Sequence, residues 1–262
     1  MVSTFRLQNP SEIMREKKTL PTKPTKLYID ADILLYRACF ASQSYDPLTE
    51  RYPDPKELFD ESVEKLFKET GLHDYTCCLS SKNNFRKEIF PDYKANRKDR
   101  PKPPGLTELR NWILTQRRGW TVDGLEADDL LGIMATSDSR NLIASLDKDM
   151  RTLPGVAWYN FKSGEYETQT KEEAKHNFLV QAIAGDSVDG YKGIPGIGPK
   201  KAEKILLEGG DRWSTVVGAY VRHGLTAQDA FVNASMAHIL TSSNFDLDTL
   251  AMTPWKPADL LE

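Results

Sequence analysis

The chain has 262 residues and a formal net charge of −3, with 39% hydrophobic and 28% charged residues. This composition is typical of a soluble globular protein and excludes an intrinsically disordered chain. Its mean hydropathy is −0.52, and no apolar run approaches the roughly 18 residues that a membrane helix needs. At roughly 150 residues per domain, the length predicts one large domain with a smaller appendage.

The first 25 residues are polar and lack an apolar segment. We expect them to form a loosely held N-terminal extension with a short helix near residues 10–18, and no signal peptide. The three cysteines are Cys39, Cys77 and Cys78. An odd number with two adjacent members excludes a disulfide scaffold or a zinc ribbon, so we expect a protein of the reducing cytoplasm.

Between residues 26 and 170, short apolar segments alternate with amphipathic ones. Buried strands are predicted at 26–30, 75–79, 141–146 and 156–160. Helices are predicted at 33–40, 56–70, 106–118 and 127–136. The four prolines within 91–105 predict an irregular loop. This alternation indicates an α/β core in which a mostly parallel central sheet is flanked by helices.

From residue 171 onward the pattern becomes helical. Helices are predicted at 172–184, 199–207 and 228–240, joined by glycine-rich turns. We therefore expect three regions, namely the extension (1–25), the α/β core (26–170) and a helical subdomain with the C-terminal tail (171–262).

Charge is segregated along the chain. Residues 82–118 contain eleven Lys or Arg against four Asp or Glu, whereas residues 123–149 contain seven acids against two bases. A solvated surface mixes its charges, so this separation indicates a basic binding face beside an acidic pocket. The alternative is chance clustering on a hydrophilic surface.

Carboxylates follow two of the predicted strands, because Asp30 ends the first and Asp147 and Asp149 follow the third. Sites in open α/β sheets gather beyond the carboxyl ends of the strands. Eight carboxylates could converge there: Asp30, Glu126, Asp128, Asp129, Asp147, Asp149, Asp186 and Asp189. Helix capping at 126–129 and turn formation at 185–190 are the simpler explanations for some of them.

Such a cluster needs a cation to offset its charge. An all-oxygen donor set without cysteine or clustered histidine selects Mg²⁺ or Mn²⁺ over zinc. Two such ions would support phosphodiester hydrolysis by activating water and stabilising the departing oxygen.

Residues 193–201 form the most specific single motif, Gly-Ile-Pro-Gly-Ile-Gly-Pro-Lys-Lys. The small residues allow a phosphate to approach the backbone, and the exposed N–H groups of the following helix attract the anion. This is the helix–hairpin–helix pattern for contact with a DNA backbone. Its candidate contacts are Gly193, Gly196, Gly198, Lys200 and Lys201.

Taken in order, five motifs resemble those of the flap-endonuclease, or 5′-nuclease, superfamily, and more closely the 5′→3′ exonucleases of T-odd podophages. They are Leu27-Tyr-Ile-Asp30, Phe90-Pro-Asp-Tyr-Lys-Ala-Asn-Arg97, Leu125-Glu-Ala-Asp-Asp129, Ser145-Leu-Asp-Lys-Asp149 and Gly185-Asp-Ser-Val-Asp-Gly190 with the hairpin that follows. The resemblance runs from about residue 27 to about residue 257. It implies a PIN-like 5′-nuclease fold and a metal-dependent 5′→3′ exonuclease acting on duplex DNA, 5′ flaps and the RNA of RNA–DNA hybrids. Its setting would be the cytoplasm of an infected bacterium.

The resemblance also implies residue roles. The first metal would be held by Asp30, Glu126 and Asp128, and the second by Asp147, Asp149 and Asp186. Asp189 and Asp129 would lie in the surroundings of the metals. Lys94, Arg97 and Arg37 would contact phosphates of the DNA, and carbonyl groups of the hairpin could hold K⁺.

One departure affects the first metal site. The family usually places an aspartate after the second strand, and the aligned position here is Ser81. An active enzyme with weaker first-site binding is the leading hypothesis, and a DNA-binding member with an impaired metal site is the alternative. A haloacid-dehalogenase-type phosphatase, indicated by Asp30-Ala-Asp32, would leave the hairpin and the basic loop unexplained.

Overall fold

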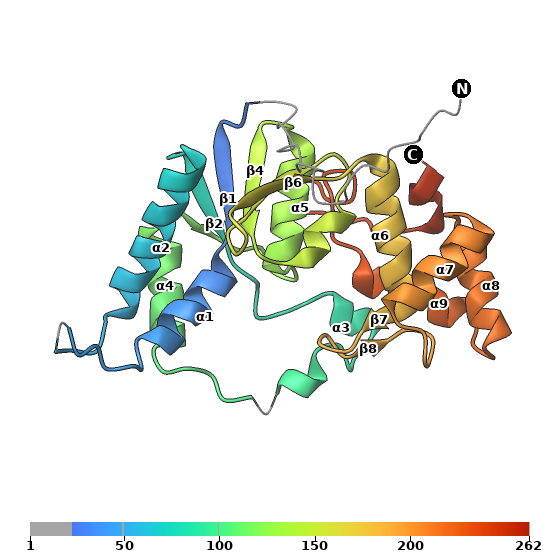
Figure 1. Cartoon of the computed structure of the whole chain (residues 1–262), viewed down its shortest axis with the longest axis horizontal. Helices are drawn as coiled ribbons and strands as arrows, with labels where there is room; N and C mark the ends of the chain where they lie inside the picture. The colour runs from blue at the N-terminus through green and yellow to red at the C-terminus, as the bar shows by residue number, and fades with distance from the viewer. Residues whose placement is uncertain (1–22, 49, 99, 262) are drawn as a thin grey trace, which may run out of the picture.

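The computed structural model describes residues 23–48, 50–98 and 100–261. Its main sheet consists of β1 (Lys26–Asp30), β2 (Tyr75–Cys78), β3 (Gly119–Trp120), β4 (Asn141–Ser145), β5 (Ala157–Asn160) and β6 (Glu165–Thr168). These strands lie in the order β3-β2-β1-β4-β5-β6 (Figure 1). All neighbours pair in parallel except β6, which is antiparallel to β5. The predicted mostly parallel sheet is confirmed, while the helix predicted at 10–18 lies outside the described residues.

Helices cover both faces of this sheet (Figure 1). On one face lie α1 (Ala31–Ala41), α2 (Pro55–Thr70) and α4 (Leu106–Gln116), which share a core with Leu27 and Ile29 of β1. On the other lies α5 (Ala127–Ser137), which shares a second core with Tyr28. The side chains of alternate residues of β1 therefore pack into cores on opposite faces of the sheet, as the pleat of a strand requires.

The helical region has its own core, formed by α6 (Lys171–Ala184), α7 (Pro199–Gly209), α8 (Trp213–Arg222) and α9 (Ala227–Ala237). Trp255 of the C-terminal tail is buried there, with ring centroids 5.4 Å from Phe178 and 5.2 Å from Trp213. The tail thus closes the helical core. The remaining short elements are α3 (Arg86–Ile89), η2 (Ala95–Arg97), η3 (Lys148–Thr152), β7 (Gly185–Asp186), β8 (Tyr191–Lys192) and η4 (Pro257–Leu261).

One predicted helix needs correction, and one helix was missed. The last helix was expected at 228–240 but ends at Ala237, because Ile239 and Leu240 leave the helix and pack into the core beside α5. The sequence analysis also missed α8, which fills the stretch between α7 and α9. In the described part of the chain, none of the helices is both long and apolar enough to cross a membrane.

Candidate active site

Asp30 and Asp147 lie at the carboxyl ends of β1 and β4, which pair in parallel. The Ser145 hydroxyl joins them, since it donates to Asp30 Oδ2 at 2.8 Å and accepts from the Asp147 N–H at 3.0 Å. The side chain of Asp30 is almost fully buried. Burial, followed by the negative charges of Asp32 and Asp147, raises the pKa of Asp30 to about 7.

Two more carboxylates belong to the same cluster. Burial and the charges of Asp147 and Asp30 raise the pKa of Asp128 well above its usual range. Burial and the charge of Asp147 raise the pKa of Asp149 to about 6. The structure therefore brings these four predicted carboxylates close enough to oppose each other's ionisation.

Glu126 and Asp189 form one edge of the cluster and share two partners, Lys94 and Tyr93. Lys94 Nζ lies 2.5 Å from Glu126 Oε1 and 3.5 Å from Asp189 Oδ2. The buried Tyr93 hydroxyl is 2.8 Å from Glu126 Oε2 and 3.2 Å from Asp189 Oδ2. Arg97 pairs with Asp189 as well. Despite burial, Lys94 and then Arg86 hold the pKa of Glu126 at about 2, so Glu126 is ionised while its neighbours resist ionisation.

Asp149 and Asp186 form a second edge, which adjoins the first because the Asp189 N–H lies 3.4 Å from Asp186 Oδ1. Lys148 Nζ lies 3.9 Å from Asp149 Oδ1 and 3.7 Å from Asp186 Oδ2. Gln181 of α6 donates to Asp149 Oδ2 at 3.0 Å, which connects this edge to the helical region. Asp186 also accepts from the Val188 N–H at 2.7 Å and so shapes the turn that leads to Asp189.

Asp129, which was expected in the surroundings of the metals, bonds to an arginine and to backbone N–H groups. It is fully buried, and its two carboxylate oxygens lie 2.7 and 2.8 Å from the two terminal nitrogens of Arg86. It also accepts from the backbone N–H groups of Glu126 and Leu240. These four bonds occupy the carboxylate, so the structure assigns Asp129 to holding the N-terminus of α5 against the C-terminal segment. Consecutive helical residues point in different directions, which is why Asp128 reaches the cluster and Asp129 does not.

A basic cavity of about 860 Å³ opens beside Glu126 and Lys94. In Figure 1 the segment between α3 and α4 runs below the sheet, and it supplies part of the cavity wall. The basic residues that line the cavity are Arg37, Lys82, Lys94, Arg97, Lys102 and Arg110. Only two acidic residues, Asp32 and Glu126, stand among the described residues of this wall, so the cavity attracts anions.

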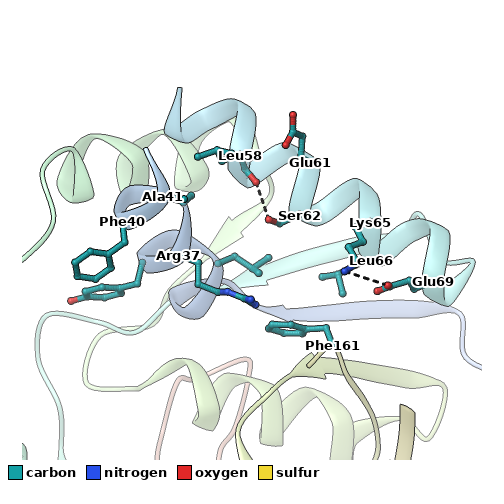
Figure 2. Close-up of a pocket in the computed structure, with 13 residues that line it drawn as sticks. Arg37, Phe40, Ala41, Leu58, Glu61, Ser62, Lys65, Leu66, Glu69 and Phe161 are labelled. Carbon is teal, nitrogen blue, oxygen red and sulfur yellow. Dashed lines mark hydrogen bonds and ion pairs between the residues drawn. The ribbon is translucent and has the colours of Figure 1, made fainter. Parts of the chain in front are cut away.

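Arg37 lies between this cavity and a second one of about 610 Å³ between α1 and α2. Figure 2 shows its side chain extending toward Phe161, whose ring centroid is 5.9 Å from the guanidinium carbon. Arg37, the predicted phosphate contact, thus lines the same basic cavity as Lys94 and Arg97.

The hairpin motif connects β8 to α7. Gly185 and Gly193 pack so closely that a Cβ on Gly185 would lie 2.1 Å from the Gly193 nitrogen. Gly196 has a φ of 76°, and Lys201 Nζ donates to its carbonyl at 2.8 Å. Gly198 caps α7 without a side-chain hydrogen bond. Pro199 has no N–H and the Lys201 N–H donates to the Gly198 carbonyl at 3.0 Å, so in the first turn of this helix the Lys200 N–H is left to contact an anion.

The donor set fits a hard divalent cation, since carboxylate oxygens are what Mg²⁺ and Mn²⁺ prefer. Within the described residues, no three His, Cys, Asp or Glu side chains are already arranged as a metal-binding group. Lys94, Arg97 and Lys148 balance part of the negative charge at the two edges. The raised pKa values of the central carboxylates indicate that this balance is incomplete, as expected of a cluster that takes up further positive charge.

The sequence analysis missed three residues that hold the site. Tyr93 had no role assigned to it, although its hydroxyl contacts Glu126 and Asp189. Its place beside Lys94 within the loop motif was the signal. Gln181 and Arg86 carried no such signal, because their partners lie 32 and 43 residues away along the chain.

Comparison with known proteins agrees with this fold. The model of a family described as 5′-3′ exonuclease, N-terminal resolvase-like domain, matches residues 25–179. The chain belongs to this 5′-3′ exonuclease family and is a nuclease-type hydrolase.

The relatives and solved structures that are similar to this chain include exonucleases and flap endonucleases. The chain is 29% identical over 212 residues to an exodeoxyribonuclease of Enterobacteria phage T3, which covers 66% of this chain and 70% of the relative. It is 34% identical over 137 residues to the flap endonuclease Xni of Shewanella oneidensis, covering 47% and 52%. The T5 5′-exonuclease with bound divalent metal ions (zinc) has the same fold, with a TM-score of 0.65, 17% identity and coverage of 82% and 89%.

Proposed function

We propose that the chain is a metal-dependent 5′→3′ exonuclease that hydrolyses phosphodiester bonds from the 5′ ends of duplex DNA. The observation that carries this proposal is the juxtaposition at Glu126, where a basic cavity meets a carboxylate cluster through Lys94. A nucleic-acid phosphate attracted by the cavity would thereby arrive at the cluster. The T5 flap endonuclease, which has the same fold, has been solved in a complex with DNA and metal ions.

In this proposal Asp30, Glu126 and Asp128 would hold one divalent ion and Asp147, Asp149 and Asp186 a second, with Asp189 nearby. The two ions would supply an activated water and stabilise the departing oxygen. Hydrolysis forms one bond from the water oxygen to phosphorus and breaks one P–O ester bond, whose oxygen is protonated.

The chain's own residues bind and orient the phosphate. Lys94 and Arg97 would exchange their carboxylate partners for phosphate oxygens, a planar guanidinium being suited to two-point contact. Arg37 would contact a phosphate farther along the strand. Tyr93 would keep Glu126 in place while Lys94 moves. The glycine hairpin with Lys200 and Lys201 would bind the duplex backbone, and K⁺ would compete with Lys201 for the Gly196 carbonyl.

We extend the proposal to 5′ flaps and to the RNA strand of RNA–DNA hybrids, since the basic residues named here would contact phosphates, which DNA and RNA share. The alternative is a DNA-binding member whose metal site is impaired at Ser81. Membership of the 5′-3′ exonuclease family leaves no support for the phosphatase hypothesis.

A duplex with one 5′-labelled strand tests the proposal when it is incubated with Mg²⁺, Mn²⁺ or EDTA and product lengths are read. Mono- or short oligonucleotides released from the 5′ end, and abolished by EDTA and by Asp147→Ala, are expected. Asp147→Ala should still shift the duplex in a gel. Retained DNA binding without cleavage in either metal by the unaltered chain would instead establish the DNA-binding alternative.

A further inference from the structure

Asp32 lies at the active site although no motif marked it as a metal-binding residue. It occupies the first turn of α1, two residues after Asp30. Its Oδ2 accepts from the Ser80 N–H at 2.9 Å, and its Oδ1 lies 3.8 Å from Arg110 Nη1. It also lines the basic cavity together with Glu126. Asp32 is thus a partly exposed carboxylate that is fixed at the end of β2.

The same place is where the first metal site lacks an expected carboxylate. Ser81 follows Ser80 directly, and its hydroxyl donates to Asp123 Oδ1 at 3.0 Å. Asp123 also accepts from the Asn83 side chain at 2.9 Å and is exposed. It is not among the described residues that form the cavity wall. Of the two carboxylates near Ser81, Asp32 is therefore the one that faces the site.

The surroundings of Asp32 repeat the pattern of the other cluster members. Arg110 lies beside Asp32 in the same way that Lys94 lies beside Glu126 and Lys148 lies beside Asp149. Each edge of the cluster thus combines a carboxylate with at least one basic side chain that a divalent ion could displace. We propose that Asp32 is a metal-binding carboxylate of the first metal site and supplies the negative charge that Ser81 does not.

This inference rests on the proposed function, and direct Mn²⁺ binding tests both separately. The free Mn²⁺ concentration would be titrated by electron paramagnetic resonance against the full chain and its variants. Asp32→Asn is expected to weaken Mn²⁺ binding roughly 10–100-fold, as loss of a supporting metal-site residue does. Asp32→Ser keeps a hydrogen-bond acceptor for the Ser80 N–H and removes the charge, so the test survives if the Asn variant fails to fold.

Ser81→Asp in the Asp32→Asn background is expected to recover most of the lost affinity, because it returns a carboxylate to the same end of β2. Asp123→Asn is the matched control and should bind Mn²⁺ as the unaltered chain does. Equal Mn²⁺ affinity in the unaltered chain and both Asp32 variants would overturn the inference but leave the proposed function standing. Failure of the unaltered chain to bind Mn²⁺ at all would overturn both.

Discussion

Replacing Arg86 should destabilise the whole protein, because this side chain is buried at the junction between the α/β core and the C-terminal segment. The Arg86 and Asp129 side chains are 3% and 0% exposed and form a two-point ion pair. Arg86 also donates to the carbonyls of Met236 at 3.2 Å and His238 at 2.6 Å. Removing one partner of a buried ion pair costs about 3–5 kcal/mol. We expect Arg86→Met to lower the free energy of unfolding by that amount.

Arg117 provides a matched control. It also forms a two-point ion pair, through Nε and Nη2 to Asp60 at 2.7 and 2.8 Å, but the two side chains are 32% and 38% exposed. Exposed pairs contribute about 1 kcal/mol or less. Urea unfolding followed by circular dichroism would give both values. Equal losses in Arg86→Met and Arg117→Met would refute the reasoning, since burial is then not the deciding factor.

Three further results are expected. In EDTA, the raised pKa values of Asp30 and Asp149 mean that the folded chain holds more protons than the unfolded chain between about pH 4 and 7. Thermal unfolding should therefore show stability falling as pH rises through this window, and Mg²⁺ should raise the melting temperature more at pH 8 than at pH 5. Tyr93→Phe should weaken Mn²⁺ binding roughly tenfold in a titration, because two carboxylates lose a shared hydroxyl; unchanged binding would contradict this. Lys200→Ala and Lys201→Ala should each lower the slope of log affinity for duplex DNA against log salt by about 0.9, measured by fluorescence anisotropy. An unchanged slope would remove the hairpin from the DNA-binding surface.

The sheet could be predicted from the sequence because each inner strand is a short run of apolar residues with a clear end. Residues 26–30 were predicted as a strand with the observed bounds. By contrast, β6 alternates Glu165, Tyr166, Glu167 and Thr168 at the sheet edge, and β3 has only two residues. Such edge strands depend on a neighbour that the local sequence does not reveal.

The part of the candidate site that could be predicted is the part that lies at the carboxyl ends of the parallel strands. Asp30 and Asp147 had to approach each other once their strands were parallel neighbours. The partner of Asp129 could not be predicted, because the local sequence does not show that Arg86 lies beside α5 and pairs with this carboxylate. Asp32 was not predicted as a metal-binding residue, because the sequence shows only that it lies two positions after Asp30. Its contacts with Ser80 and Arg110 appear only in the folded structure.

The segment that carries Lys94 is attached to the carboxylate cluster in two independent ways. Its side chains pair with Glu126 and Asp189, but its backbone is also fixed, since the Lys94 N–H donates to the Asp189 carbonyl at 2.7 Å. Lys94 has a φ of 56°, a conformation that costs a non-glycine residue free energy and that the surrounding contacts must stabilise. Asn96 adds bonds to the carbonyls of Ser187 and Val188. Because these contacts do not involve the charged groups, the segment can give its positive charges to a phosphate and still keep its place beside the cluster.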